Sequence, residues 1–155
     1  MIFVIIGTQD KPFVRLLNAI EKLDTKEEII VQAGHTKFEN IKNNIKIFDF
    51  IDNSYFNELL DKADIIITHG GVGTIMQALN KNKKVIAVSR LSKFNEHQND
   101  HQLEIVNNFT KLGYILDCTN LDLLPETIQS INSFIPNKYK SNNESFKQII
   151  IDYIN

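Results

Sequence analysis

The sequence lacks the features that mark several common classes of protein. Its 155 residues include one cysteine, Cys118, which excludes a framework of intramolecular disulfide bonds. Lysine and arginine number 17 and aspartate and glutamate 19, so the net charge of −2 lacks the basic excess of a nucleic-acid-binding domain. No stretch reaches the roughly 20 apolar residues that a membrane-spanning helix needs. We therefore expect neither a nucleic-acid partner nor a membrane span.

The remaining composition is that of a globular domain. An apolar share of 43% over 155 residues supports one domain with a substantial core. Residues 1–6 are apolar, but Gly7, Thr8 and Gln9 follow at once, so this run is too short for a signal peptide and lacks a basic segment before it. We expect it to form the first strand, and we expect a cytoplasmic protein.

Apolar runs and helical patterns alternate along the chain. Short apolar runs predict strands at Ile2–Ile6, Ile29–Ala33, Ile45–Phe50, Ile65–Thr68, Val85–Val88 and Tyr114–Leu116. Apolar residues at helical spacing lie between them and predict helices, among them segments over Thr74–Asn80 and Leu121–Ile135. This alternation predicts an α/β fold, a Rossmann-like doubly wound parallel sheet covered by helices on both faces.

The last part of the chain differs in composition. Residues 1–135 form the predicted domain, and residues 136–145, rich in Asn, Lys and Ser, predict a polar linker. An apolar stripe over residues 146–155 predicts a C-terminal helix, with Phe146, Ile149, Ile150 and Tyr153 on one face. This helix either docks back on the domain or packs on another subunit, and the sequence leaves both alternatives open.

The most informative segment is 63–74. Its apolar run ends at His69, and three glycines follow before a helical pattern begins, namely Gly70, Gly71 and Gly73. A strand that passes through a glycine-rich turn into a helix places free backbone N–H groups at the positive end of a helix dipole, which favours a phosphate group. The alternative is a tight turn without a ligand. His69 is either a core histidine bonded to the backbone or a donor to a phosphate oxygen.

Two common phosphate-binding signatures are absent. No G-x-x-x-x-G-K-[ST] run exists, which excludes a Walker loop. A dinucleotide-binding fold needs G-x-G-x-x-G after the first strand and an acid after the second, whereas here Gly7 stands alone and residues 31–33 are Val-Gln-Ala. A nicotinamide cofactor is therefore not expected. The glycines instead follow the fourth strand, beside the point where a doubly wound sheet reverses its order and binds ligands.

A second polar cluster spans residues 94–102, Phe-Asn-Glu-His-Gln-Asn-Asp-His-Gln. Acids and amides at the end of the fifth strand suit the hydroxyl groups of a sugar. His97 and His101, four residues apart, are spaced to share a helix face, so a metal site is an alternative, although no third ligand lies nearby in the sequence. A further alternative is a solvated helix N-terminus, in which Asn95 and Glu96 are capping and first-turn residues.

Taken in order, these motifs resemble the donor-binding half of GT-B glycosyltransferases, and specifically the family 28 C-terminal domain. The resemblance covers roughly residues 1–120 and rests on segments 68–74, 85–88 and 96–102. Segments 7–13 and 31–34 look most like the short catalytic subunits of two-chain capsular and exopolysaccharide glycosyltransferases. The short subunit of the dolichol-linked GlcNAc transferase is similar as well.

The resemblance implies a role for each part of the site. Residues 50–51 match the segment that contacts uracil, residues 70–74 the diphosphate loop, and residues 100–102 the region that reads the donor sugar. The implied donor-binding residues are Gly7, Thr8, Phe50, Ile51, His69, Gly70, Gly71, Val72, Gly73, Thr74, Gln77, Arg90, Glu96, Asp100, His101 and Gln102. His69 is the expected stabiliser of the leaving group, and we expect Gly71→Val to weaken UDP binding more than it destabilises the fold.

Gln77 stands where family members often carry a glutamate that holds the ribose hydroxyls, so the charged, bidentate contact is lost here. Arg90 lies between the fifth strand and the second polar cluster, where it pairs with a phosphate, pairs with Glu96 or is solvated.

The function implied is that of the UDP-sugar-binding, catalytic subunit of a two-component inverting glycosyltransferase in capsule or exopolysaccharide synthesis. The donor would be UDP-galactose, UDP-N-acetylglucosamine or UDP-glucuronate, with no cofactor and no metal, consistent with the lack of an Asp-x-Asp motif. Since the first strand begins at Ile2, the acceptor-binding half and the base are expected on a membrane-associated partner that holds a lipid-linked saccharide. That partner would keep this chain at the inner face of the membrane. The alternative is a non-catalytic nucleotide-sugar-binding regulatory module.

Overall fold

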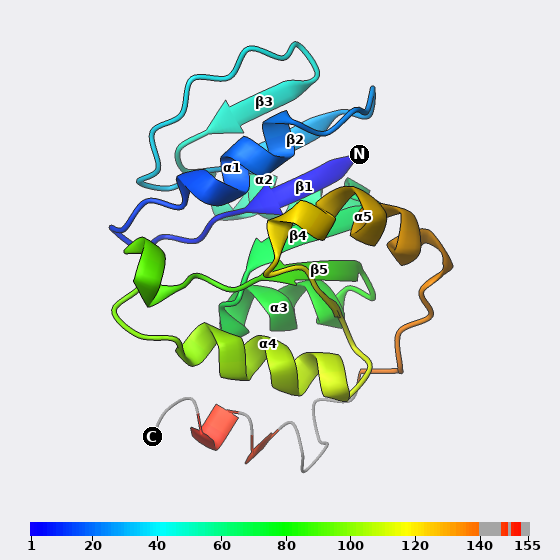
Figure 1. Ribbon diagram of the computed structural model, residues 1–155. Coiled ribbons are helices and arrows are strands. Elements are labelled where there is room, and N and C mark those ends of the chain that lie inside the picture. The colour runs from blue at the N-terminus through cyan, green and yellow to red at the C-terminus, as the bar shows by residue number, and fades with distance from the viewer. Residues whose placement is uncertain (140–146, 149, 153–155) are drawn as a thin grey trace.

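The computed structural model describes residues 1–139, 147–148 and 150–152. Six strands form one parallel sheet in the order β3-β2-β1-β4-β5-β6 (Figure 1). They are β1 (Ile2–Ile5), β2 (Ile29–Gln32), β3 (Ile45–Phe48), β4 (Ile65–His69), β5 (Lys84–Val88) and β6 (Leu116–Asp117). The order reverses between β1 and β4, so the sheet is doubly wound with its switch point there, and the predicted fold class is confirmed.

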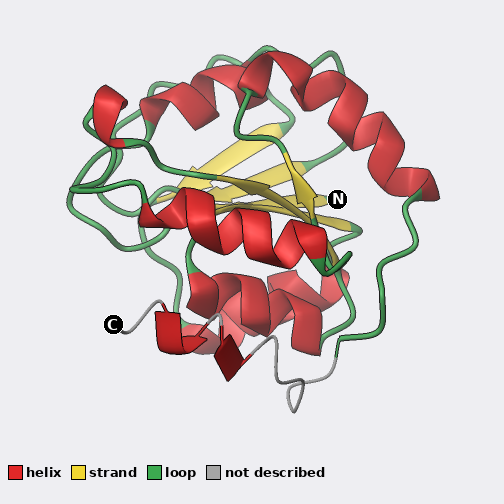
Figure 2. Ribbon diagram, turned by 60° about the horizontal axis from the view of Figure 1, so that its bottom comes forward, coloured by secondary structure: helices red, strands yellow, loops and turns green. Residues whose placement is uncertain are grey.

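Helices cover both faces of the sheet, as Figures 1 and 2 show. They are α1 (Val14–Glu21), α2 (Asn53–Lys62), α3 (Val72–Asn80), α4 (His101–Lys111) and α5 (Leu124–Ser133). Buried residues of α1 and α5 belong to one apolar cluster, and those of α2, α3 and α4 belong to the cluster on the other face. Each helix therefore buries one apolar stripe against the sheet.

The pairing of the central strands β1 and β4 determines where the loops that follow them meet. Every residue of β1 is buried, with Phe3 in the cluster on one face and Val4 in the cluster on the other. Fully burying such a side chain contributes roughly 1.5–3 kcal/mol, and a shift by one residue would exchange the two faces. The register therefore pairs Ile5 with Thr68 and brings the loops after β1 and β4 side by side.

Several element boundaries differ from the predicted ones. The sixth strand was predicted at Tyr114–Leu116, but β6 spans Leu116–Asp117 because the ladder with β5 begins at Leu116. The segment predicted as one helix, Leu121–Ile135, begins as a 3₁₀ turn over Leu121–Leu123, and α5 follows with a proline in its first turn. β3 ends at Phe48, two residues before the predicted end, so Phe50 lies in a loop.

The segment after α5 is held against the domain. The start of the predicted linker is not free: the Asn137 N–H donates to the Gly113 carbonyl (2.8 Å), and Tyr139 meets the Tyr114 ring edge to face at 5.6 Å. Residues 147–148 and 150–152 are helical, and Ile150 packs on the cluster beneath α3 and α4. Residues 140–145 of the linker, with Phe146, Ile149 and Tyr153, lie outside the described residues. Ile150 thus favours docking on the domain itself.

Candidate functional site

A cleft of about 410 Å³ opens where the loops after β1 and β4 meet, at the switch point of the sheet. Of the predicted donor-binding residues, its lining includes Gly7, Thr8, Phe50, Ile51, His69, Gly71, Val72, Gly73, Thr74 and Gln77. The fold thus gathers segments that lie far apart in the sequence. The remaining predicted residues, Gly70, Arg90, Glu96, Asp100, His101 and Gln102, are not part of this lining.

The N-terminus of α3 offers unpaired donors to this cleft. Gly71, the N-cap residue, has no side chain to bond the first turn, and that turn carries no acidic residue. Within the described part of the chain, no hydrogen bond uses the backbone N–H groups of Val72, Gly73 or Thr74. An anion bound here would meet these donors together with the positive end of the helix dipole.

The ring of His69 lies between two glycines from different loops. A Cβ atom on Gly7 would stand 2.7 Å from His69 Nε2, and a Cβ atom on Gly71 would overlap the ring at Cε1. The His69 residue is only 8% exposed. Burial, helped by the nearby Arg90 cation, lowers the pKa of His69 from 6.5 to about 3. The ring is therefore neutral at pH 7 and acts in the cleft as a hydrogen-bonding group without charge.

The three glycines after β4 serve different purposes. A Cβ on Gly70 would stand 2.8 Å from Gln102 Cβ, so this glycine lets α4 approach the loop. The missing side chain of Gly71 makes room for His69, whereas a Cβ on Gly73 would meet nothing within 4 Å. A valine at Gly71 would collide with the His69 ring, so Gly71→Val should disturb the fold as well as the cleft. Gly73 is the glycine whose open space is free for a ligand.

Gln102 ties the glycine loop to the end of β5. Its Oε1 accepts hydrogen bonds from the backbone N–H groups of Gly70 (2.9 Å) and Arg90 (3.0 Å), and its Nε2 lies 3.3 Å from His69 Nδ1. The residue is 3% exposed. In this structure the Gln102 amide therefore supports the loop from behind.

Arg90 is a buried cation that binds three main-chain carbonyl groups. Its guanidinium donates to the carbonyl oxygens of Ile6 (2.8 Å), Lys11 (2.7 Å) and Glu96 (3.0 Å), and it lies 4.9 Å from the centre of the Phe13 ring. Burial lowers its pKa to about 10, so it keeps its charge at neutral pH. The alternative of a solvated arginine is wrong, since the residue is 0% exposed. Arg90 fastens the loop after β1, which forms one wall of the cleft, to the loop after β5.

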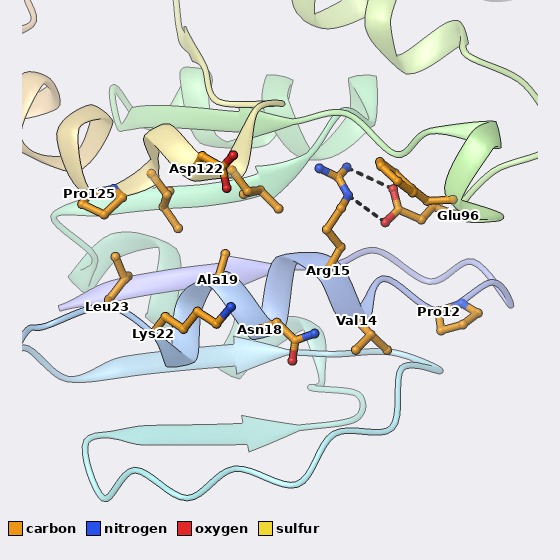
Figure 3. A pocket seen from close by; sticks show the side chains of 13 residues that line it. Pro12, Val14, Arg15, Asn18, Ala19, Lys22, Leu23, Glu96, Asp122 and Pro125 are labelled. Atoms are coloured by element: carbon orange, nitrogen blue, oxygen red, sulfur yellow. Dashed lines mark hydrogen bonds and ion pairs between the residues drawn. The ribbon is translucent and has the colours of Figure 1, made fainter.

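The Glu96 carboxylate is paired with Arg15, a residue that no motif in the sequence marked as part of the site. Arg15 reaches across from α1 and donates through Nε and Nη2 to the two carboxylate oxygens, each at 3.0 Å (Figure 3). The backbone N–H of Leu91 donates to the same carboxylate at 3.1 Å. The pair lies beside a second hollow, of about 720 Å³, between α1 and the start of α5. The alternative of a first-turn helix residue is wrong for Glu96, because α4 begins only at His101.

Most other polar residues of this region are exposed, and His97 is partly buried. Asp100 Oδ1 accepts the backbone N–H of Ser92 (2.9 Å), which lowers the pKa of that carboxyl group. His101 begins α4, but His97 lies before the helix and accepts the Asn99 N–H at 3.3 Å, so the two histidines do not share a helix face. Within the described ranges, no group of three or more His, Cys, Asp or Glu residues is arranged to hold a metal ion.

Part of the lining of the cleft was not predicted from the sequence. The residues concerned are Ile5, Gln9, Gln32, Asn53 and Phe56. Gln32 is 7% exposed, and its side-chain amide makes no hydrogen bond within the described residues. A polar residue at the carboxyl end of an otherwise apolar strand was the signal for it. Near it, Phe50 is 55% exposed at the rim of the cleft and meets the His35 ring edge to face at 5.2 Å.

Comparison with known proteins relates the chain to sugar transferases. The sequence profile described as "Glycosyltransferase family 28 C-terminal domain" matches residues 1–154. The UDP-N-acetylglucosamine transferase subunit ALG13 of Candida albicans is 35% identical over 83 residues, which are 54% of this chain and 26% of that protein. The UDP-N-acetylglucosamine--N-acetylmuramyl-(pentapeptide) pyrophosphoryl-undecaprenol N-acetylglucosamine transferase of Streptococcus agalactiae is 27% identical over 156 residues, 92% of this chain and 42% of that protein.

Known structures share the fold. The NMR solution structure of ALG13 superposes with a TM-score of 0.63 at 21% identity, over 99% of this chain and 96% of that one. MurG of Acinetobacter baumannii gives a TM-score of 0.60 at 18% identity, over 83% of this chain and 40% of that one. The chain spans about a quarter of the length of the Candida relative and less than half of the streptococcal one.

Proposed function

The chain belongs to the glycosyltransferase family 28 C-terminal domain family, and from this premise we propose that it binds a UDP-sugar as the catalytic, donor-binding half of an inverting glycosyltransferase. The observation that carries the proposal is the cleft at the switch point, where the unpaired N–H groups of α3 and the neutral His69 ring lie together. This arrangement suits a diphosphate. The exposed Phe50 and the unpaired amide of Gln32 line the far side, where a nucleoside would lie.

The chemistry follows from these donors. In the transfer, the bond between the anomeric carbon and the diphosphate oxygen breaks while the acceptor oxygen attacks from the opposite face. The acceptor proton passes to a base, and UDP leaves with the negative charge. The N–H groups of residues 72–74 and the α3 dipole are already in place to stabilise that charge, so no reorganisation is needed during the reaction. We therefore propose leaving-group stabilisation without a metal ion.

We propose UDP-N-acetylglucosamine as the first donor to test, because the relatives from Candida and Streptococcus carry that substrate in their names. UDP-galactose and UDP-glucuronate are the other candidates, and synthesis of a capsular or extracellular polysaccharide is the proposed setting. Gln77 on α3 lines the cleft and offers a neutral amide to the ribose hydroxyls.

A partner chain completes the proposed enzyme. The relatives from Candida, Saccharomyces cerevisiae and Homo sapiens are each named as a transferase subunit. We propose a membrane-associated partner that binds the lipid-linked saccharide, supplies the base and closes the cleft. Among the described residues, no helix combines the length and apolar character needed to cross a bilayer. Attachment to the inner face of the membrane is accordingly proposed to come through that partner.

Calorimetric titration of the full chain with UDP and with each UDP-sugar tests donor binding, and a transfer assay with the co-expressed partner tests catalysis. We expect UDP to bind the wild-type chain and the Thr74→Val variant, which keeps the backbone N–H groups, with similar affinity. Absence of UDP binding at about 1 mM, with the partner present, would overturn the proposal. UDP binding without transfer by the complex would instead support a non-catalytic regulatory module.

A further inference from the structure

The side-chain amide of Gln102 has only one chemically acceptable orientation. One end of the amide faces two backbone N–H groups, those of Gly70 at 2.9 Å and Arg90 at 3.0 Å. Both groups donate, so the atom between them must be the oxygen, which alone can accept. Turning the amide over would place an NH₂ group against two other donors in a site that is 3% exposed. The two N–H groups therefore fix the orientation.

The other end of the amide determines where His69 carries its proton. Gln102 Nε2 lies 3.3 Å from His69 Nδ1. An amide nitrogen only donates, so Nδ1 must present its lone pair, and a neutral imidazole then has its proton on Nε2. Burial keeps the ring neutral, since the pKa of His69 falls to about 3.

The Nε2 atom lies on the cleft side of the ring. It is the ring atom nearest to Gly7, 2.7 Å from the position of a Cβ there, and both residues line the cleft. Within the described residues, no hydrogen bond uses Nε2. We propose that Gln102 is a positioning residue that holds the proton of His69 on Nε2, so that the ring presents an N–H donor to an anion in the cleft. The statement about the anion rests on the proposed function, whereas the position of the proton does not.

Long-range ¹H–¹⁵N correlation NMR of the ¹⁵N-labelled full chain at pH 7 without ligand reads the tautomer directly. In the wild type we expect a protonated Nε2 and an unprotonated Nδ1 on His69. In Gln102→Glu one carboxylate oxygen can still accept from Gly70 and Arg90, but the other accepts from Nδ1, so the proton should move to Nδ1. The control is Gln129→Glu, the same change at an exposed position of α5, which should leave the His69 spectrum unchanged.

A wild-type spectrum with the proton on Nδ1 would overturn the proposal, and this measurement needs no variant to fold. A Gln102→Glu variant that folds but leaves Nδ1 unprotonated would also overturn it. In UDP titrations we expect Gln102→Glu to bind about tenfold or more weakly than Gln129→Glu, since a hydrogen bond to a charged group is lost. Equal UDP affinities of the two variants would refute the role of Gln102 in anion binding. Failure of the wild type to bind UDP would refute only the proposed function.

Discussion

The imidazole of His69 occupies the space that a side chain on Gly71 would need. This relationship separates two glycines of one loop that look alike in the sequence. Gly71 is required by the fold of the protein itself, whereas the space beside Gly73 is open. The two positions therefore provide a matched pair of variants.

We predict that Gly73→Ala lowers UDP affinity about tenfold or more, because a methyl group in the open space keeps an anion away from the N–H donors of α3. The same change should leave stability unchanged or raise it by up to about 1 kcal/mol, since alanine is the better helix former. Gly71→Ala should lower both stability and affinity. Urea denaturation and calorimetry measure the two properties, and wild-type UDP affinity in Gly73→Ala would contradict the assignment.

The Gln32 side chain is predicted to contact the nucleoside end of the ligand. In the sheet, Gln32 of β2 lies between Ile5 of β1 and Phe48 of β3. It is therefore two strands away from β4, the strand that leads into α3, and it lines the cleft together with Phe50. Gln32→Leu should weaken UDP binding severalfold, through loss of a hydrogen bond worth about 1 kcal/mol, and leave binding of inorganic pyrophosphate unchanged. Stability should not fall, because an unpaired amide is replaced by an apolar group. An equal loss for UDP and pyrophosphate would refute this placement.

The ion pair between Arg15 and Glu96 is predicted to hold the fold together. The Glu96 side chain is 4% exposed and that of Arg15 22%. Removal of one partner of a buried pair leaves an uncompensated charge, so Glu96→Leu should lower the free energy of unfolding by about 3 kcal/mol. Much of the lost free energy of unfolding should be recovered in the double variant Arg15→Met/Glu96→Leu.

Urea denaturation measures these free energies. The control is Glu58→Ala, which breaks the exposed pair of Glu58 with Lys62 on α2 and should leave stability nearly unchanged. If the double variant were as unstable as Glu96→Leu alone, the ion pair would not be the cause.

Stability is predicted to depend on pH through His69. Its pKa falls from 6.5 to about 3 on folding, so between these values the unfolded chain binds a proton that the folded chain does not. The free energy of unfolding should therefore decrease as pH falls from about 6.5, by up to about 1.4 kcal/mol per pH unit from this residue. Burial also lowers the pKa of His97, which acts in the same direction.

Urea denaturation of the wild type and of His69→Gln, at several pH values between about 4 and 7, isolates this contribution. The variant should lose stability less steeply with falling pH, because carboxyl groups and His97 contribute equally to both proteins. Identical slopes would show that folding does not lower the pKa of His69.

Local patterns in the sequence were sufficient to predict the architecture of the fold. Strands β1, β2, β4 and β5 are each built on an apolar run, and such runs need burial wherever they lie, so their alternation with helices predicted the doubly wound sheet. The position of the cleft followed as well, because chain order and right-handed crossovers place the end of β4 at the switch point. The limits of the elements were less predictable: Tyr114 is buried and apolar in pattern, yet it lies before β6.

The partners of the polar residues were decided by the tertiary structure. Glu96 and Arg15 are 81 positions apart, and no pattern near either residue indicates that α1 and the loop after β5 meet. Gln102 was expected to read a sugar, but packing of α4 against Gly70 brings its amide to His69. The sequence by itself thus determined the sheet, the glycine loop and the free N–H groups of α3, which depend on neighbouring residues. The tertiary structure decided which glycine leaves room for a ligand and which polar groups serve the fold, because these depend on contacts between distant segments.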